Sequence, residues 1–484
     1  MKGEMSGTEK VTGNVIAMSG GEVGSRLIAF LGTTYLARTL EPAGFGVISF
    51  ATALFGYFYF TTVAGFNDTA SREIARRPQE AANIAAGVLF VRLMLAAAAM
   101  VALSVAAWGL SKPSSVKLVV ILTGLSFFSL ALDTSWVYKG LERSRMAGLA
   151  LILGQALYVG AVWMIVRGPA DLPRVPLAQF FGEMGAALLL AVPLFRSGRI
   201  KPEWREGWRI LRGSWSLAIT RLLRMLMTSF DLVLLGLLLG EREAGLYAAP
   251  YRICFLFLAV AAAIQSSYLP AITRAWARSA EQTKAIAARS VGFSAAVAAP
   301  AIVGGILLAA SLLQAVFGPD YAAGAWAFRL LLLSMGFICF FGTAHNILLA
   351  CGRMKDEMLL MAVAAGLNVG LNLIVIPRYG LVGAAVVTAL TEGLVLMTAL
   401  LTVARLGVGI SLRPLWRPFL AAGVMGASLI ALVPNSGIAL QLGLGVGVYV
   451  VTLFLCRGVP DDAQPHLRQI VSLAGELRRK LQRA

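Results

Sequence analysis

The sequence predicts an all-α polytopic membrane protein of about fourteen transmembrane helices, arranged as two pseudo-symmetric six-helix lobes plus two C-terminal helices. Hydrophobic residues make up 58% of the 484-residue chain and charged residues only 14%. A soluble protein of this length would need more polar surface. Apolar stretches of roughly 18 to 25 residues, long enough to cross about 30 Å of hydrocarbon, recur along the chain. The connections between them are short.

The spans are expected to start near residues 13, 43, 83, 117, 147, 176, 211, 244, 285, 325, 358, 381, 416 and 438. Lys and Arg residues concentrate in alternate connections, as the positive-inside rule requires of the cytoplasmic side. This pattern predicts a multi-pass protein of the bacterial cytoplasmic (inner) membrane with both termini in the cytoplasm. The net charge of +18 is then mainly a topology signal. It does not indicate nucleic-acid binding, because no basic soluble domain is present.

Five regions are expected along the chain: an N-terminal six-helix lobe over residues 1–195, a cytoplasmic linker over 196–212, a second six-helix lobe over 213–404, two additional spans over 405–457 and an amphipathic cytoplasmic tail over 458–484. A weak repeat supports two lobes. Residues 43–46 (AGFG) lie between the first and second spans, and residues 244–247 (AGLY) lie between the seventh and eighth. Both copies leave the cytoplasm in the same direction, so the predicted repeat is parallel.

Five arginines lie inside predicted spans: Arg26, Arg92, Arg221, Arg224 and Arg252. A guanidinium is always charged and is costly at bilayer depth, so each is expected to face a water-filled cavity or an anionic partner. Arg221, Arg224, Thr228 and Asp231 are spaced by three, four and three residues and form one stripe on the seventh helix. A positive interior of this kind suits a large anion that crosses the bilayer.

A purely structural role is the alternative for these arginines. Glu22 precedes Arg26 by one helical turn and Asp231 follows Arg224, so either acid can neutralise its neighbour. Arg221 and Arg252 have no acid at such spacing in their own span, which favours a substrate-binding role for both. The acidic candidates for coupling to protons or sodium are Glu22, Asp133, Glu183, Asp231 and Glu392. His345 is expected to be a hydrogen-bonded interior residue rather than a switch.

Catalysis finds no support in the sequence. No nucleophile with its base, no Gly-rich phosphate loop and no metal-ligand spacing is visible, so neither an enzyme nor a cofactor or metal site is expected. The four cysteines, Cys254, Cys339, Cys351 and Cys456, form no close pair and indicate no disulfide.

The stretch from Ala365 to Gly393, AGLNVGLNLIVIPRYGLVGAAVVTALTEG, resembles the signature of the Wzx-type polysaccharide-biosynthesis flippases, in the multidrug/oligosaccharidyl-lipid/polysaccharide exporter superfamily. The N-terminal run around Arg26, Arg38 and Gly44-Phe45-Gly46 and the loop Phe317 to Tyr321 resemble the family too. Within the signature we expect an architectural role. Pro377 is expected to end the eleventh span, with Gly380 and Gly383 allowing the chain to reverse. The matching residues are Asn368, Asn372, Pro377, Gly380, Gly383 and Thr388.

The resemblance implies a flippase that moves an undecaprenyl-diphosphate-linked oligosaccharide from the cytoplasmic to the outer leaflet by alternating access. Such a protein serves surface polysaccharide assembly, for example of lipopolysaccharide O-antigen or exopolysaccharide. Its expected partners are membrane lipid, the lipid-linked oligosaccharide, and a glycan polymerase and glycosyltransferases. Related lipid II flippases are similar in placing arginines on the first and eighth spans, which by position points to Arg26 and Arg252. The diphosphate site is therefore expected at Arg26, Arg221, Arg224 and Arg252.

Several other functions stay open at this stage. A cation-coupled multidrug exporter or a lipid II flippase of the same superfamily would share the architecture. A membrane glycan polymerase or ligase would need a large external loop with catalytic groups, and the loops here are short. A lipid scramblase would have no need of buried arginines.

Overall fold

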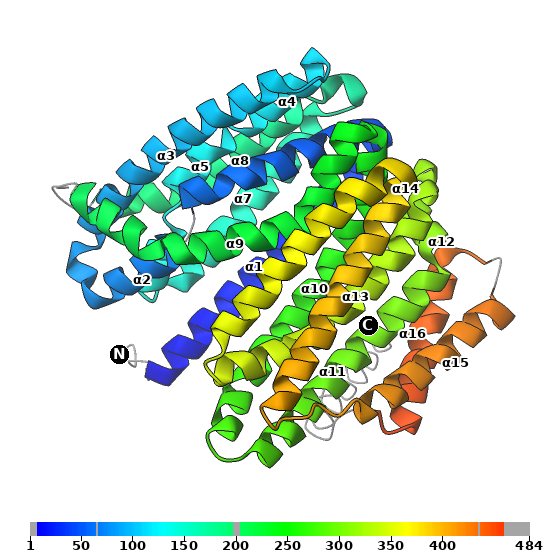
Figure 1. Cartoon of the computed structure of the whole chain (residues 1–484). Helices are drawn as coiled ribbons and strands as arrows, with labels where there is room; N and C mark the ends of the chain where they lie inside the picture. Colours follow the sequence, from blue (N-terminus) through cyan, green and yellow to red (C-terminus); the bar gives the residue numbers. More distant parts are fainter. Residues whose placement is uncertain (1–6, 64–65, 197–203, 434–435, 459–484) are drawn as a thin grey trace, which may run out of the picture. The chain divides into compact units, whose positions relative to one another are not determined.

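The computed structural model describes residues 7–63, 66–196, 204–433 and 436–458, and every regular element within them is a helix (Figure 1). Eleven helices are long and apolar enough to cross a membrane. Two of them, α1 and α14, each hold two spans, and α9 has a shorter apolar part, Thr228–Leu238. Counting these separately yields the fourteen spans predicted, and the expected fold class is confirmed. The predicted amphipathic helix in the tail lies outside the described residues.

The helices follow one another in a simple order. The α-helices are α1 (Gly7–Val63), α2 (Phe66–Arg76), α3 (Ala81–Gly109), α4 (Ser114–Thr123), α5 (Ser126–Leu132), α6 (Ser135–Gly140), α7 (Ser144–Ile165), α8 (Arg174–Phe195), α9 (Trp204–Leu238), α10 (Glu241–Trp276), α11 (Ala280–Leu307), α12 (Ala309–Phe317), α13 (Ala325–Ala350), α14 (Met354–Arg405), α15 (Trp416–Leu432) and α16 (Ile438–Leu455). Short 3-10 turns are η1 (Pro78–Glu80), η2 (Pro169–Asp171), η3 (Pro319–Gly324) and η4 (Arg413–Leu415).

The two long helices are divided by single residues with non-helical backbone angles. In α1 the break is Glu41, with φ of 59°, directly before Pro42. In α14 it is Gly380, with φ of 57° and ψ of −143°, a conformation that glycine adopts without steric cost. The expectation that Pro377 ends the eleventh span is wrong in detail. The helix runs through Pro377, and the chain reverses at Gly380.

The fourth span is also interrupted, at Asp133 between α5 and α6. The Asp133 carboxylate accepts hydrogen bonds from the backbone N–H of Ser135, at 3.0 Å, and from its hydroxyl, at 2.7 Å. A carboxylate in this position satisfies amide groups that a new helix leaves unpaired, as an N-cap does. The short helix α6 therefore starts where the sequence supplies an acid followed by serine.

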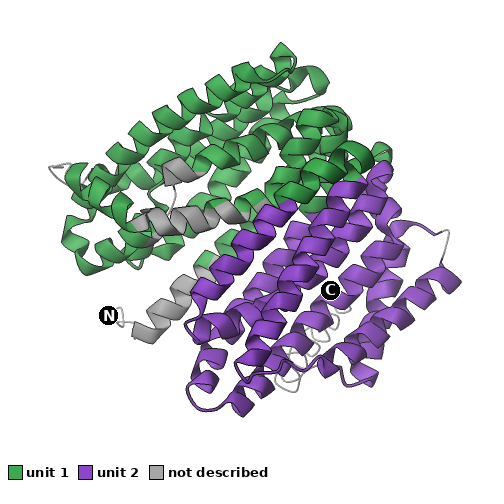
Figure 2. Ribbon diagram, viewed as in Figure 1, with its two compact units in different colours: residues 1–252, 316–321, 369–381 green, residues 253–315, 322–368, 382–484 purple. Residues whose placement is uncertain are grey.

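Contacts divide the chain into two compact units (Figure 2). Unit 1 contains residues 1–252 together with the short segments 316–321 and 369–381. Unit 2 contains residues 253–315, 322–368 and 382–484. These units differ from the predicted lobes, because α9, the first part of α10 and two later segments group with the N-terminal helices. The lobe boundaries stay a prediction.

In unit 1, α1, α7 and α8 pack closely through glycines. A Cβ added at Gly21 on α1 would lie 2.6 Å from the Cα of Gly148 on α7, and one added at Gly182 on α8 would lie 2.8 Å from the carbonyl oxygen of Gly154 on α7. Helix pairs in membranes associate through small residues that let the backbones approach, because lipid offers no hydrophobic driving force between helices. The glycines thus fix which faces of these helices meet.

The second half of the predicted linker is the beginning of α9, which starts at Trp204. There Gly207 packs on α3, where an added Cβ would lie 2.4 Å from the carbonyl oxygen of Gly87. Ile210 is 3% exposed and belongs to the same apolar cluster as Trp136 and Val88. The start of α9 is therefore an integral part of unit 1.

In unit 2, the two C-terminal helices pack on α11. Met425 of α15 and Tyr449 of α16 share an apolar cluster with Ala299 of α11. The Tyr449 hydroxyl donates a 2.7 Å hydrogen bond to the carbonyl oxygen of Ala296. The last two spans are thus fastened to this unit.

Candidate functional site

The arginines predicted to share a role have different surroundings. Arg92 on α3 is fully buried. Its guanidinium donates hydrogen bonds to the carbonyl oxygens of Asp133, at 3.1 Å, and of Leu130. These carbonyls lie at the interruption of the fourth span, where the Leu130 oxygen also accepts a 3.3 Å hydrogen bond from the Asp133 N–H and the Asp133 oxygen a 3.0 Å one from the Trp136 indole N–H. The Asp133 carboxylate also interacts electrostatically with the Arg92 guanidinium. Arg92 thus binds the interrupted helix and has an anionic partner there, one of the two surroundings expected for an intramembrane arginine.

Arg252, on α10, lies in a different environment. Its side chain is partly buried, and it makes no hydrogen bond or ion pair with any described residue. The one group that interacts with it electrostatically, within the described part of the chain, is the Tyr158 hydroxyl of α7. A guanidinium carries five N–H donors and cannot lose its charge. Among the described residues, Arg252 is therefore a cation without an ion pair in a membrane helix.

Arg26 and Glu22 lie on the first half of α1, and both are exposed. Their spacing predicted an ion pair, but no ion pair or hydrogen bond joins the two side chains in the described part of the molecule. Arg26 is thus accessible for another anion. Whether it acts on one stays a prediction.

The stripe on the seventh helix is only partly described. The backbone of α9 carries Arg221 and Arg224 on the face of Thr228 and Asp231, but the side chains of both arginines lie outside the described residues. Asp231 is fully buried. It accepts hydrogen bonds from the Tyr247 hydroxyl at 2.5 Å and from the Tyr251 hydroxyl at 3.4 Å.

Glu183, on α8, lies in a polar pocket of unit 1. Its Oε2 is 2.6 Å from the Ser129 hydroxyl of α5, and its Oε1 accepts a 2.9 Å hydrogen bond from the Gln179 amide. Asp133 and Tyr158 interact with it electrostatically. The sequence identified Glu183 but missed its neighbours. The available signal was the pair Ser126 and Ser129, one turn apart in an otherwise apolar part of the span.

The signature residues have mainly structural surroundings. In unit 2, the Asn368 amide donates a 3.0 Å hydrogen bond to the Thr391 hydroxyl, which joins the two halves of α14. Asn372 is fully buried in unit 1. Glu392 follows Thr391 and is partly buried. The hydrogen bond of Asn368 is consistent with the architectural role expected of the signature, which stays a prediction.

His345 also behaves as predicted. Its Nδ1 lies 2.6 Å from the carboxylate of Glu357, at the start of α14. No group of three or more His, Cys, Asp or Glu residues in the described chain is arranged to hold a metal ion.

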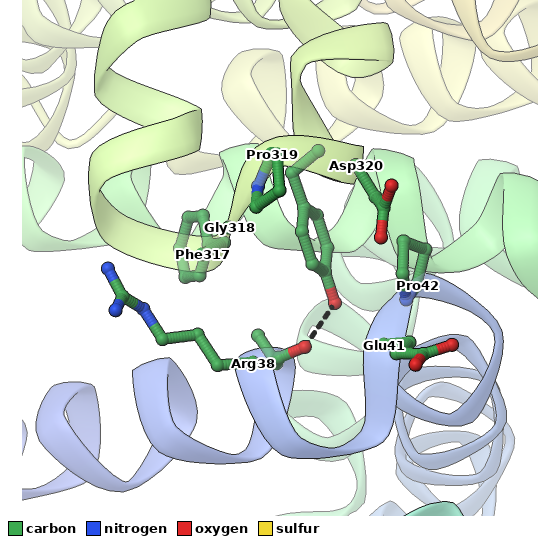
Figure 3. Close-up of a pocket in the computed structure, with 9 residues that line it drawn as sticks. Arg38, Glu41, Pro42, Phe317, Gly318, Pro319 and Asp320 are labelled. Atoms are coloured by element: carbon green, nitrogen blue, oxygen red, sulfur yellow. Dashed lines mark hydrogen bonds between the residues drawn. The ribbon is translucent and has the colours of Figure 1, made fainter.

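A pocket of about 260 Å³ lies at the predicted external end of unit 1, between the break in α1 and the loop Phe317 to Tyr321. Arg38, Glu41 and Asp320 line it (Figure 3). The Arg38 Nε donates a 2.8 Å hydrogen bond to the carbonyl oxygen of Val316, and the Tyr321 hydroxyl donates one of 3.0 Å to that of Ala37. Its walls are thus joined by two hydrogen bonds between segments almost three hundred residues apart in sequence.

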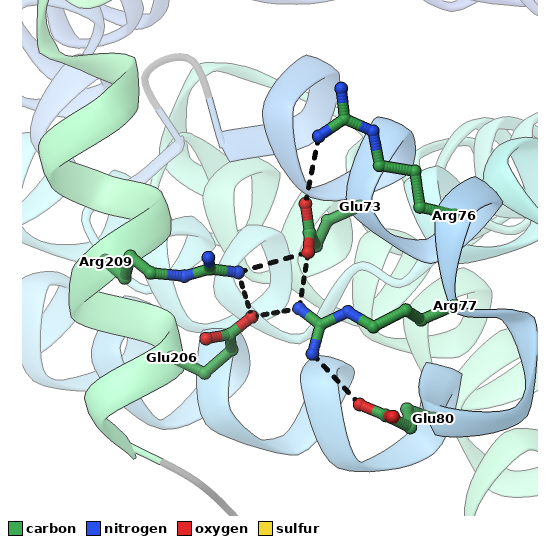
Figure 4. Close-up of polar contacts among 6 residues, drawn as sticks. All are labelled: Glu73, Arg76, Arg77, Glu80, Glu206 and Arg209. Atoms are coloured by element: carbon green, nitrogen blue, oxygen red, sulfur yellow. Dashed lines mark hydrogen bonds and ion pairs between the residues drawn. The ribbon is translucent and has the colours of Figure 1, made fainter.

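At the predicted cytoplasmic end of unit 1, charged residues join α2 to α9 (Figure 4). Glu73 accepts hydrogen bonds from Arg77 and, at 3.1 Å, from Arg209. Glu206 accepts from the same two arginines, both at 2.5 Å. The hydrogen bonds from Arg77 and Arg209 hold the pKa of Glu73 below its ordinary value. Two carboxylates and two guanidiniums thus form a closed network of four charged hydrogen bonds.

Known structures share this fold. The chain is similar to a lipid II flippase, MurJ, in an inward closed conformation, with a TM-score of 0.75, 13% identity, and coverage of 90% of this chain and 98% of that one. It is also similar to an inward-facing multidrug resistance MATE family transporter of the MOP superfamily, with a TM-score of 0.59, 17% identity, and coverage of 81% and 94%. The chain therefore shares the polytopic α-helical fold of these two proteins.

Sequence comparison identifies the family. The model described as polysaccharide biosynthesis protein matches residues 11–276, more than half of the chain, so this protein belongs to the polysaccharide biosynthesis protein family. A probable low-salt glycan biosynthesis flippase, Agl15 of Haloferax volcanii, is 22% identical over 75% of this chain and 77% of its own. A putative O-antigen transporter of Escherichia coli is 22% identical over 49% and 58%.

Proposed function

We propose that the protein is a flippase that translocates an undecaprenyl-diphosphate-linked oligosaccharide from the cytoplasmic to the outer leaflet for surface polysaccharide assembly. The main support for this proposal is the environment of Arg252. Its guanidinium lies in a membrane helix and forms no hydrogen bond with any described side chain or carbonyl. An unpaired charge at such a position is costly unless a substrate compensates it. A diphosphate does so, because a guanidinium binds phosphate oxygens through two parallel hydrogen bonds.

Arg26, Arg221 and Arg224 complete the proposed diphosphate site. Arg26 is exposed and forms no ion pair with Glu22, so it is available to the same anion. In the proposed cycle two lobes alternate access to this site from either leaflet. Glu22, Asp231, Glu183 and Glu392 are candidates for ion coupling. We place the protein in a bacterial inner membrane with both termini cytoplasmic, and a glycan polymerase and glycosyltransferases are its proposed partners.

The names of the relatives favour this substrate class over the alternatives. Two of them are a probable glycan biosynthesis flippase and a putative O-antigen transporter. A lipid II flippase remains the second candidate, supported by the fold shared with MurJ. Both candidates require a lipid diphosphate. The positive charge of Arg252 would instead repel the cationic substrates of a multidrug exporter.

Transport in proteoliposomes tests the proposal. The substrate is a fluorescent undecaprenyl-diphosphate disaccharide at a concentration below saturation. We expect Arg252→Ala to weaken substrate binding by about 1.5–3 kcal/mol, the usual contribution of a hydrogen bond to a charged group. The transport rate should then fall roughly ten- to a hundredfold. Arg252→Lys should recover only part of the loss, because lysine keeps the charge but not the planar fork.

Arg329→Ala is the matched control. Arg329 also lies in a membrane helix, but its guanidinium donates to the Ile306 carbonyl oxygen at 3.1 Å and stacks on Trp326. It should transport at the parental rate. Full activity of Arg252→Ala would overturn the proposed site. Transport of a cationic dye without any transport of the lipid diphosphate would favour the multidrug alternative.

A further inference from the structure

The polar pocket around Glu183 has a composition that points to a specific ligand. Four groups surround the carboxyl in unit 1: the Ser126 and Ser129 hydroxyls of α5, the Gln179 amide of α8 and the Tyr158 phenol of α7. The Ser126 side-chain oxygen is buried and has no hydrogen-bond partner within bonding distance. These groups are neutral.

The charges that face this pocket do not neutralise a carboxylate. Asp133, at the break after α5, has the same sign as an ionised Glu183. Arg92, on α3, donates to the carbonyl oxygens at that break. Arg252, on α10, interacts with the pocket only through Tyr158 in the described part of the chain. Arg92 interacts electrostatically with Asp133, so its charge is directed to that carboxylate. An ionised Glu183 would therefore be a partly buried anion without an ion pair, which is an unfavourable state.

The hydrogen bonds fit the neutral acid. The Ser129 hydroxyl lies 2.6 Å from Glu183 Oε2 and 3.0 Å from the carbonyl oxygen of Ser126, but it has one hydrogen to donate. If Glu183 carries a proton on Oε2, it donates to the Ser129 oxygen, and Ser129 donates to the Ser126 carbonyl. The Gln179 N–H then bonds the remaining oxygen, Oε1. Every short contact has a hydrogen in this arrangement.

We propose that Glu183 is the proton-binding site of this transporter and that its charge controls Arg252 through Tyr158. The inference rests on the proposed function and names its coupling ion. Tyr158 packs directly against the residue before Glu183, since a Cβ added at Gly182 would lie 2.8 Å from the Tyr158 Cβ. Its hydroxyl interacts electrostatically with both Glu183 and Arg252. With Glu183 protonated, Arg252 is available to the diphosphate. When the proton passes from Oε2 to water, the carboxylate competes for the positive charge and the diphosphate is released.

The neighbours of Glu183 favour a proton over sodium. A sodium ion requires several oxygen lone pairs directed toward it, whereas Gln179 presents an N–H to the carboxyl group. The 2.6 Å contact between Ser129 and Glu183 is also explained without a metal ion, since a protonated carboxyl donates to the Ser129 oxygen. The pocket is therefore arranged for a carboxylic acid rather than for an ion cage.

Infrared spectroscopy of the full chain in proteoliposomes tests the proton site without requiring transport. At neutral pH, we expect a carboxylic-acid C=O band that shifts in D2O and that is missing in Glu183→Gln. Glu281→Gln, at an exposed glutamate, should keep the band. Identical spectra of the parent and Glu183→Gln would overturn the proposal. If the band of the parent protein disappears when sodium chloride replaces choline chloride, Glu183 binds sodium, and its assignment as a proton site is overturned.

Binding of undecaprenyl diphosphate without sugars tests the link to Arg252. We expect the affinity of the parent protein for undecaprenyl diphosphate to fall by about tenfold over the pH range in which the carboxylic-acid band disappears. A change of this size is within the usual range of coupling between two sites. In Glu183→Gln the affinity should be high and independent of pH. Parental affinity that does not change while the band disappears would overturn the link. If no diphosphate binds at any pH while the band is present, the proposed function fails and the proton site stands.

Discussion

At the scale of single residues, the environment of an arginine decides its role. Arg92 and Arg252 are the same residue type in similarly apolar segments, yet the first donates to two backbone carbonyls and the second has no direct partner in the described chain. The sequence could not separate them, because the partners of Arg92 lie about forty residues away at an interruption that local patterns do not reveal.

This difference predicts opposite effects of substitution. Arg92→Ala should lower stability by about 3 kcal/mol or more, since it removes two charged hydrogen bonds to carbonyl oxygens and the buried charge that offsets Asp133. Arg252→Ala should leave stability unchanged or raise it, because it removes an unpaired charge. Thermal unfolding of both purified variants measures the difference. Equal losses of Tm would contradict the structural role assigned to Arg92.

At the scale of elements, α2 and the start of α9 in unit 1 are joined by charge as well as by the apolar cluster that holds Ile74 and Ile210. Two arginines donate hydrogen bonds to the same two carboxylates, those of Glu73 and Glu206. Arg77 directly follows α2, and Arg209 lies in the second turn of α9. The shared carboxylates hold the start of the seventh span to the first helices.

This cluster should respond to acid. The pKa of Glu73 is lower in the folded protein than its ordinary value of about 4.3, because Arg77 and Arg209 bind the ionised form. Its contribution to stability is therefore present above the unfolded-state pKa and is lost as the pH falls through the lower folded-state pKa. Since the side chain of Arg209 is 60% exposed, Arg209→Ala should cost at most about 1 kcal/mol near neutral pH.

Thermal unfolding across a pH series measures this cost. The difference between Arg209→Ala and the parent should shrink in acid. Arg205→Ala is the matched control, because Arg205 is an exposed neighbour that stacks on Trp204 and, in the described chain, forms no ion pair with Glu73 or Glu206. A difference that stays constant with pH would exclude the carboxylates as its cause.

At the scale of the whole molecule, the predicted external ends of several helices meet within unit 1. A Cβ added at Gly46 would lie 1.7 Å from the Glu241 carbonyl oxygen, and one at Gly245 would lie 1.8 Å from that of Pro42. The two copies of the predicted repeat are therefore in direct backbone contact. Lys112 adds a 2.9 Å ion pair to Glu241. If two lobes alternate, contacts at this end have to open in each cycle.

A reversible cross-link tests whether these contacts open. In a protein whose four cysteines are replaced, a short bifunctional thiol reagent across Arg38→Cys and Val316→Cys should stop transport, because it fixes a contact that has to separate. Reduction should restore activity. Arg174→Cys with Ile165→Cys is the matched pair, since Arg174 also donates to a carbonyl oxygen, that of Ile165, at 3.1 Å, within one helical hairpin. The cross-linked control should transport normally. Undiminished transport by the first cross-linked pair would show that its contact is static.

The sequence by itself determined the class of fold, the span positions and the residues that warranted attention. These features can be read from short stretches of sequence, since each span has to cross the same hydrocarbon thickness and Lys and Arg gather in the connections on one side. The chain reversal near Gly380 was also predictable from a short stretch, because glycine there permits the turn. Only the tertiary structure decided that Arg92 closes a broken helix, that Glu183 lies among Ser129, Gln179 and Tyr158, and that the helix before Gly213 belongs to unit 1. These facts depend on which helix faces meet, and small residues set that through contacts between segments distant in sequence.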